Sequence, residues 1–142
     1  MRLVLDTNIL ISSLIRKDTP PYLLYLAWRH QRFDLLTSSH QLAEVAGVLA
    51  RPRLQKYVSP TEAQEMVRGL RTEAEQVDVG LIAVSSSPDP DDNRILAIAI
   101  VGQANYVVSG DRADMLSLGE VEGIPVITAR QIVDILRLTS QP

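Results

Sequence analysis

Two aspartates of this 142-residue sequence stand at the ends of short apolar segments, where side chains often do chemistry. Asp6 follows the apolar residues 2–5, and Asp111 follows residues 106–109 through a Ser-Gly-Asp turn. Each has an ordinary explanation, because aspartate caps helices and Ser-Gly-Asp is favourable turn chemistry. If the two segments are parallel strands of one sheet, however, both carboxylates lie at the edge where binding sites form.

Glu44 is the only charged residue between His40 and Arg51, within the apolar stretch LAEVAGVLA. A helix this apolar presents little surface to water, and an unpaired buried carboxylate is costly. No lysine or arginine stands one turn away in the same segment. We therefore expect Glu44 either to pair with a cation from elsewhere in the fold or to belong to a site.

Asp89, Asp91 and Asp92 surround Pro90 at the start of the apolar segment ILAIAIVGQA. A capping aspartate, a proline at the first helical position and acids in the first turn all suit a helix start. Because the helix is apolar, one of these acids is also able to point inward. The spacing alone does not choose between Asp91 and Asp92.

A single metal site explains these acids better than separate accidents. Carboxylates a few ångströms apart repel by roughly 4 kcal/mol per pair at an effective dielectric near 20, so a cluster calls for a divalent cation. Oxygen ligands favour Mg²⁺ or Mn²⁺, as one or two ions. Zinc is not expected, because the sequence lacks cysteine and His30 and His40 have no paired-ligand spacing.

Composition indicates one ordinary globular domain, with 46% hydrophobic and 22% charged residues. No apolar run approaches the roughly 18 residues of a membrane span, and no signal-peptide pattern is present. The lack of cysteine is compatible with a cytoplasmic location. Residues 1–76 hold ten Lys/Arg and eight Asp/Glu, and residues 77–142 hold four and nine. This asymmetry suits a metal site that handles a polyanion, or is ordinary surface charge.

Short apolar segments alternate with longer helical ones along the chain. Strands are expected at residues 2–5, 34–37, 81–84, 106–109 and 125–127. Helices are expected at residues 7–15, 20–30, 38–49, 60–76, 89 to about 104, and 128–138. The alternation predicts a three-layer α/β/α fold around a short-stranded parallel sheet, as a single domain over residues 1–138 with a tail at 139–142.

Three segments of the sequence together resemble the PIN-domain ribonucleases. They are VLDTNILIS at 4–12, SSHQLAEVAGVLARPRLQKY at 38–57 and DPDDNRILAIAIVGQANYVVSGDRADML at 89–116. The likeness is greatest to the VapC-like toxins of bacterial and archaeal toxin–antitoxin pairs, and it runs from residue 3 to about residue 132. It implies a PIN-like fold with four metal-binding acids. These acids fall on Asp6, Glu44, Asp92 and Asp111.

The resemblance also distinguishes residues that spacing leaves open. The family's D-x-x-I-x-A-x-A pattern falls on Asp92 and selects it over Asp91. Many relatives place a second aspartate directly after SGDR, whereas Ala113 stands there in this sequence, so Asp114 is given a structural role. Side chains expected to support the acids or to contact substrate are Asn8, Ser109 and Arg112.

The implied activity is that of a Mg²⁺- or Mn²⁺-dependent endoribonuclease that hydrolyses phosphodiester bonds of single-stranded or structured RNA. The resemblance further implies a toxin silenced by a small antitoxin, and a homodimer. A PIN-fold RNA-processing or DNA-directed nuclease outside such a pair, and a catalytically silent binding domain, stay open. Cations beside the cleft would hold the phosphate backbone. The candidates are Arg16, Lys17, Arg51, Arg53 and Arg112.

Other phosphate-handling classes fit the sequence less well. A haloacid-dehalogenase-type phosphotransferase needs a second aspartate where Asn8 stands, and a receiver domain needs a late lysine, but none follows Lys56. No Walker-type glycine loop is present. The aromatic-rich segment 22–28 is expected to pack in the core rather than to form an interface.

Overall fold

A mostly parallel sheet forms the centre of the computed structural model, which describes residues 1–80 and 82–138. The strand order is β3-β2-β1-β4-β6-β5, and every neighbouring pair is parallel except β5 and β6. The first strand therefore lies inside the sheet, between β2 and β4. The strands are β1 (Arg2–Leu5), β2 (Asp34–Thr37), β3 (Glu75–Gln76), β4 (Tyr106–Val108), β5 (Glu120–Val121) and β6 (Ile124–Ile127).

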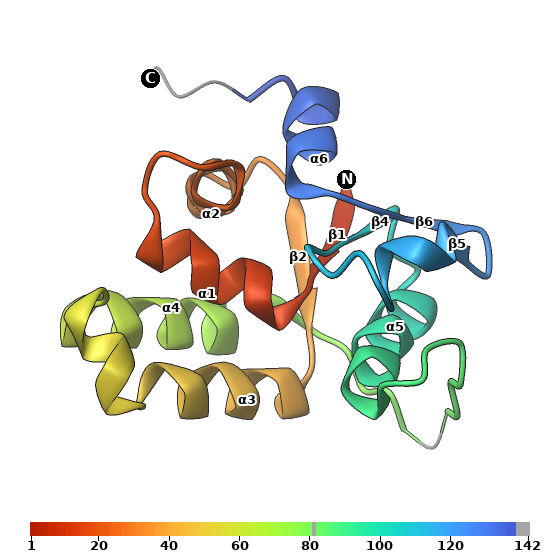
Figure 1. The fold of residues 1–142 in the computed structure, drawn as a ribbon, viewed down its shortest axis with the longest axis horizontal. Coiled ribbons are helices and arrows are strands. Elements are labelled where there is room, and N and C mark those ends of the chain that lie inside the picture. Colours follow the sequence, from red (N-terminus) through yellow and green to blue (C-terminus); the bar gives the residue numbers. More distant parts are fainter. Residues whose placement is uncertain (81, 139–142) are drawn as a thin grey trace.

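Helices cover both faces of this sheet, as Figure 1 shows. The α-helices are α1 (Thr7–Ile15), α2 (Pro20–Arg29), α3 (Ser39–Leu49), α4 (Pro60–Thr72), α5 (Pro90–Gly102) and α6 (Ala129–Leu136). The described residues also form two short 3₁₀ segments, η1 (Pro52–Lys56) between α3 and α4 and η2 (Leu116–Leu118) between β4 and β5. The predicted three-layer α/β/α fold is confirmed.

Alternating side chains of β1 divide the core into two layers, because successive residues of a strand point to opposite faces. Leu3 and Leu5 pack with residues of α1–α4 and α6, whereas Val4 packs with residues of α5. All three are at most 1% exposed, so β1 is covered on both sides. The predicted core role of the aromatic helix also holds, since Tyr25 and Trp28 of α2 are buried.

Helix starts follow the capping chemistry of the sequence. Ser59 and Glu62 form a capping box at the start of α4, and the Ser38 hydroxyl accepts a hydrogen bond from the Gln41 N–H at the start of α3. The Asp89 carboxylate accepts one from the Asp91 N–H at the start of α5. These caps fix where α3 and α5 begin, and so which side chains face the end of the sheet.

The sheet edge beside β2 differs from the sequence prediction. Helix α4 ends at Thr72 rather than at Gln76, and Glu75–Gln76 pairs with β2 as β3. The predicted strand at 81–84 is wrong for residues 82–84, which lie outside any strand; Leu81 is outside the described residues. An ion pair between Arg2 and Glu75, with 2.7 Å between Nη2 and Oε2, favours this polar edge strand. The predicted tail, 139–142, also lies outside the described residues.

Candidate metal centre

Asp6 lies at the carboxyl end of β1, where the chain turns into α1. Its N–H donates to the Val108 carbonyl of β4 at 2.8 Å, so the backbone holds the residue between the two strands. Its carboxylate accepts a hydrogen bond from the Ser109 hydroxyl at 2.9 Å. Burial raises the pKa of Asp6, while the Ser109 hydrogen bond acts in the opposite direction. The carboxylate is therefore turned towards the end of the sheet.

Glu44 projects from α3 towards α1, where the Thr7 hydroxyl donates to its carboxylate at 2.5 Å. The helix is fixed against β1 by Gln41, whose side-chain amide donates to the Leu5 carbonyl at 2.8 Å and accepts from the Thr37 hydroxyl at 2.7 Å. Among the described residues Glu44 makes no ion pair. The described residues therefore do not show the structural ion pair with a distant cation that was one of the two explanations for Glu44.

Asp92 and Asp91 have different environments at the start of α5. Asp91 is exposed and pairs with Arg94, with 2.7 Å between Oδ1 and Nη1. Asp92 is 7% exposed and accepts a hydrogen bond from the Ser87 hydroxyl at 3.1 Å. Burial raises the pKa of Asp92 to about 6, and nearby acids, Asp6 among them, add to the increase. An inward-facing carboxylate with a raised pKa is typical of a functional site.

Asp111 follows β4 in a turn that its own side chain supports. Its carboxylate accepts hydrogen bonds from the N–H groups of Ala113 and Asp114 at 3.0 and 3.2 Å. The Ser109 hydroxyl, which donates to Asp6, also accepts from the Asp111 N–H at 3.1 Å. The turn explanation is therefore correct for this residue. The Ser109 hydroxyl also links the Asp111 backbone to the Asp6 carboxylate, and both aspartates line the same cavity.

The four acids converge on one cavity of about 310 Å³ at the carboxyl ends of β1 and β4. α1, α3 and α5 supply its walls. Parallel strands end together at this edge, which is why residues so distant in sequence meet there. Its lining residues are Asp6, Thr7, Asn8, Glu44, Val48, Arg51, Asp89, Asp91, Asp92, Ile95 and Asp111.

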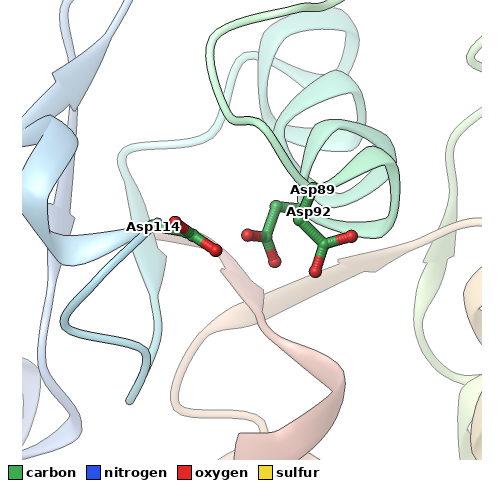
Figure 2. A group of neighbouring side chains, drawn as sticks. All are labelled: Asp89, Asp92 and Asp114. Carbon is green, nitrogen blue, oxygen red and sulfur yellow. The ribbon is translucent and has the colours of Figure 1, made fainter.

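Asp89 and Asp114 join the acids that sequence reasoning selected. Oxygens of Asp89, Asp92 and Asp114 all lie within 4.8 Å of one another. In Figure 2, Asp114 reaches from the segment after β4 towards the two aspartates at the start of α5. Sequence reasoning gave Asp89 only its cap and Asp114 only a structural role. The signal for Asp114 was its position three residues after Asp111, within the same turn.

The charge balance of this cluster fits a divalent cation. None of the ion pairs among residues 1–80 and 82–138 involves the four predicted acids. Oxygens of Asp89, Asp92 and Asp114 lie within 4.8 Å of one another, and carboxylates at such a separation repel by roughly 4 kcal/mol per pair at an effective dielectric near 20. Their oxygens are hard ligands, of the kind that Mg²⁺ and Mn²⁺ take. The side chains present are thus suited to hold such an ion.

The predicted phosphate-binding cations do not all lie near the acids. Arg51 lines the cavity, whereas Arg53 and Arg112 are exposed and do not line it. Lys17 pairs with Glu62, with 2.8 Å between Nζ and Oε2. Arg16 lines a different cavity, between α1 and α2. The structure therefore brings one of the five candidates to the acids.

Comparison with known proteins identifies the family. The family model for the PIN domain matches residues 2–113, and the chain belongs to this family of nucleases, which generally use a divalent metal. A chain of the crystal structure of VapBC2 from Rickettsia felis bound to a DNA fragment from their promoter shares the fold. It has a TM-score of 0.56 and 17% identity, over 90% of this chain and 98% of that one. A search of curated proteins gave no match.

No helix in the described residues is long and apolar enough to cross a membrane.

Proposed function

We propose that this PIN-domain protein is a Mg²⁺- or Mn²⁺-dependent endoribonuclease, the toxin of a toxin–antitoxin pair. One observation carries the proposal: Asp6, Glu44, Asp92 and Asp111 line a single cavity, and none of them is neutralised by an ion pair within the described residues. Acids left unpaired at such a cost are expected to bind a cation. The PIN-domain match adds the chemistry of phosphodiester cleavage.

Each part of the site has a task in that reaction. A divalent cation supplies Lewis-acid stabilisation of the phosphate and lowers the pKa of a bound water. The four acids hold the cation, and Ser109 orients two of them, because its hydroxyl donates to Asp6 and accepts from the Asp111 N–H. Asn8 lines the same cavity and would contact the substrate or support the acids there. Neither a cysteine nor a Ser–His pair is needed as nucleophile.

The antitoxin part of the proposal is supported by the fold that this chain shares with one chain of the VapBC2 structure. A toxin must be silenced in the cell that makes it, and a small protein that covers the acid cavity would do so. Co-expression of the chain with a small open reading frame beside its gene, followed by co-purification and a cleavage assay, tests this part. A neighbouring protein that neither binds nor inhibits would count against it.

Cleavage of labelled single-stranded RNAs by the purified protein tests the nuclease part. Wild type is expected to cut in Mn²⁺ and not in EDTA. Asp6→Asn is expected to reduce the cleavage rate at least about 100-fold. Loss of a residue that supports a metal ligand already costs about 10–100-fold in activity, and loss of a ligand itself should cost no less. Glu75→Gln, at the opposite end of the sheet, should cut as wild type. Equal cleavage by Asp6→Asn, or no cleavage of any RNA by wild type, would reject the mechanism. Cleavage of DNA but not of RNA would show that the substrate is DNA.

A further inference from the structure

Arg51 lies two residues past the end of α3, the helix that carries Glu44. Glu44 and Val48 are four residues apart and share one face of that helix. All three line the acid cavity. The Arg51 N–H donates to the Val48 carbonyl at 3.1 Å, and Pro52 then starts η1, so the backbone at Arg51 is fixed on both sides.

The guanidinium of Arg51 is free for a ligand. Arg51 is exposed, and within the described residues its side chain makes no ion pair and no hydrogen bond. By contrast, Arg2, Lys17, Arg29 and Arg94 all pair with carboxylates. Arg51 is also the one cation among the described residues that line the acid cavity. A positive charge thus stands beside the acids without neutralising any of them.

We propose that Arg51 binds a backbone phosphate of the RNA and so holds the strand across the acid cavity. This inference rests on the proposed function, since the acids define where the strand is cut. A guanidinium matches phosphate oxygens with two parallel N–H donors, and it keeps its charge at any physiological pH. Because Arg51 lies past the end of the helix that carries Glu44, it contacts the strand beside the acids rather than at them. The other reading of Arg51 is a counter-charge that only offsets the repulsion between carboxylates.

RNA binding measured against salt distinguishes these two roles. The probe is a fluorescently labelled single-stranded RNA in Ca²⁺, followed by anisotropy over a series of KCl concentrations and checked for intactness on a gel. Arg51→Gln is expected to weaken binding about tenfold, as loss of a charge-assisted hydrogen bond does. It should also reduce the slope of log K against log salt by about 0.7, the value for one phosphate on a single strand.

Two further variants sharpen this test. Lys56→Gln removes one positive charge from η1, the 3₁₀ segment that directly follows Arg51, and Lys56 does not line the acid cavity. RNA binding and the salt slope of this variant should therefore match wild type. Arg51→Lys should keep the salt slope, because the charge remains, while binding less tightly than arginine. In cleavage assays Arg51→Gln should raise KM about tenfold with little change in kcat, the pattern of lost uniform binding.

The outcomes separate this inference from the proposed function. If wild type cuts RNA but Arg51→Gln keeps the wild-type salt slope, or Lys56→Gln loses as much, the Arg51 inference is wrong and the nuclease stands. If wild type binds RNA with an Arg51-dependent slope but cuts none, the nuclease proposal fails and the inference stands. A changed Mn²⁺ affinity with unchanged RNA binding identifies Arg51 as a counter-charge and overturns the inference. Wild type that binds no RNA overturns it as well.

Discussion

Cavities that contain acidic side chains lie at both ends of the sheet, but the acids at the two ends differ in whether they form ion pairs. At the amino end, a cavity of about 400 Å³ includes Glu73 and Glu75, and each glutamate pairs with an arginine, Arg29 and Arg2 respectively. At the carboxyl end, the four predicted acids share a cavity without such a pair in the described residues. Paired acids add to stability, whereas unpaired ones lower it, and we propose that the unpaired acids of this site bind a cation.

Divalent metal should stabilise the protein through the carboxyl-end acids. With free Mn²⁺ at about 100 times its Kd, the gain is about 2.7 kcal/mol, or roughly 5–10 °C in melting temperature for a chain of this size. Thermal melts in EDTA and in Mn²⁺ measure it. The same rise is expected for Glu75→Gln, and a much smaller one for Asp92→Asn. A rise that survives Asp92→Asn would place the metal elsewhere.

Asp92 should make the metal-free protein less stable as pH increases. Burial raises the pKa of Asp92 from its usual 3.8 to about 6, so the folded state holds a proton that the unfolded state has released. The stability this proton provides is complete below about pH 4 and is lost as pH rises through 6. Asp92→Asn carries no ionisable group at this position and so does not lose this stability. Its free energy of unfolding should exceed that of wild type by about 1–3 kcal/mol at pH 7.5.

Urea unfolding of both proteins in EDTA, at pH 4 and at pH 7.5, measures this difference. The gap between Asp92→Asn and wild type should be close to zero at the lower pH. A gap of the same size at both pH values would show that the substitution acts through packing rather than through the charge of Asp92.

Glu75 at the amino end should show the opposite dependence and the smallest effect. The hydrogen bond from Arg2 lowers the pKa of Glu75 below its usual 4.5, so its contribution is present above that pH and is lost on acidification. Both side chains are partly exposed, and such pairs contribute about 0.2–1 kcal/mol. Glu75→Gln should therefore lose less than about 1 kcal/mol of unfolding free energy at pH 7, and the loss should shrink as the pH is lowered below 4.5. A larger loss by urea unfolding at neutral pH would mean that the edge strand β3 depends on this pair.

The sequence predicted the parts of the site that backbone position determines. Asp6 and Asp111 were identified because each follows a buried strand, and parallel strands end together. The choice between Asp91 and Asp92 needed the family resemblance, and the structure shows its physical basis in the pairing of Asp91 with Arg94 and the burial of Asp92. The proximity of Asp114 to Asp89 and Asp92 was not predicted, because the direction of a side chain in a turn is not encoded by spacing.

The edge of the sheet was predicted poorly for a related reason. Glu75–Gln76 has neither apolar alternation nor β-branched residues, so nothing local marks it as a strand. Its pairing with β2 is a tertiary effect, supported by the contact between Arg2 and Glu75. The apolar residues at 81–84 gave a stronger strand signal in the sequence, but β3 occupies the position beside β2.

The place of β1 inside the sheet has a consequence for how the protein is made. One side of β1 pairs with β2. The other side pairs with β4, which comes about a hundred residues later in the chain. Asp111 and Asp114 leave the ribosome later still. A chain whose first hundred residues have emerged therefore has only part of its acids and an open strand edge. The four predicted acids therefore come together only once β4 is inserted beside β1.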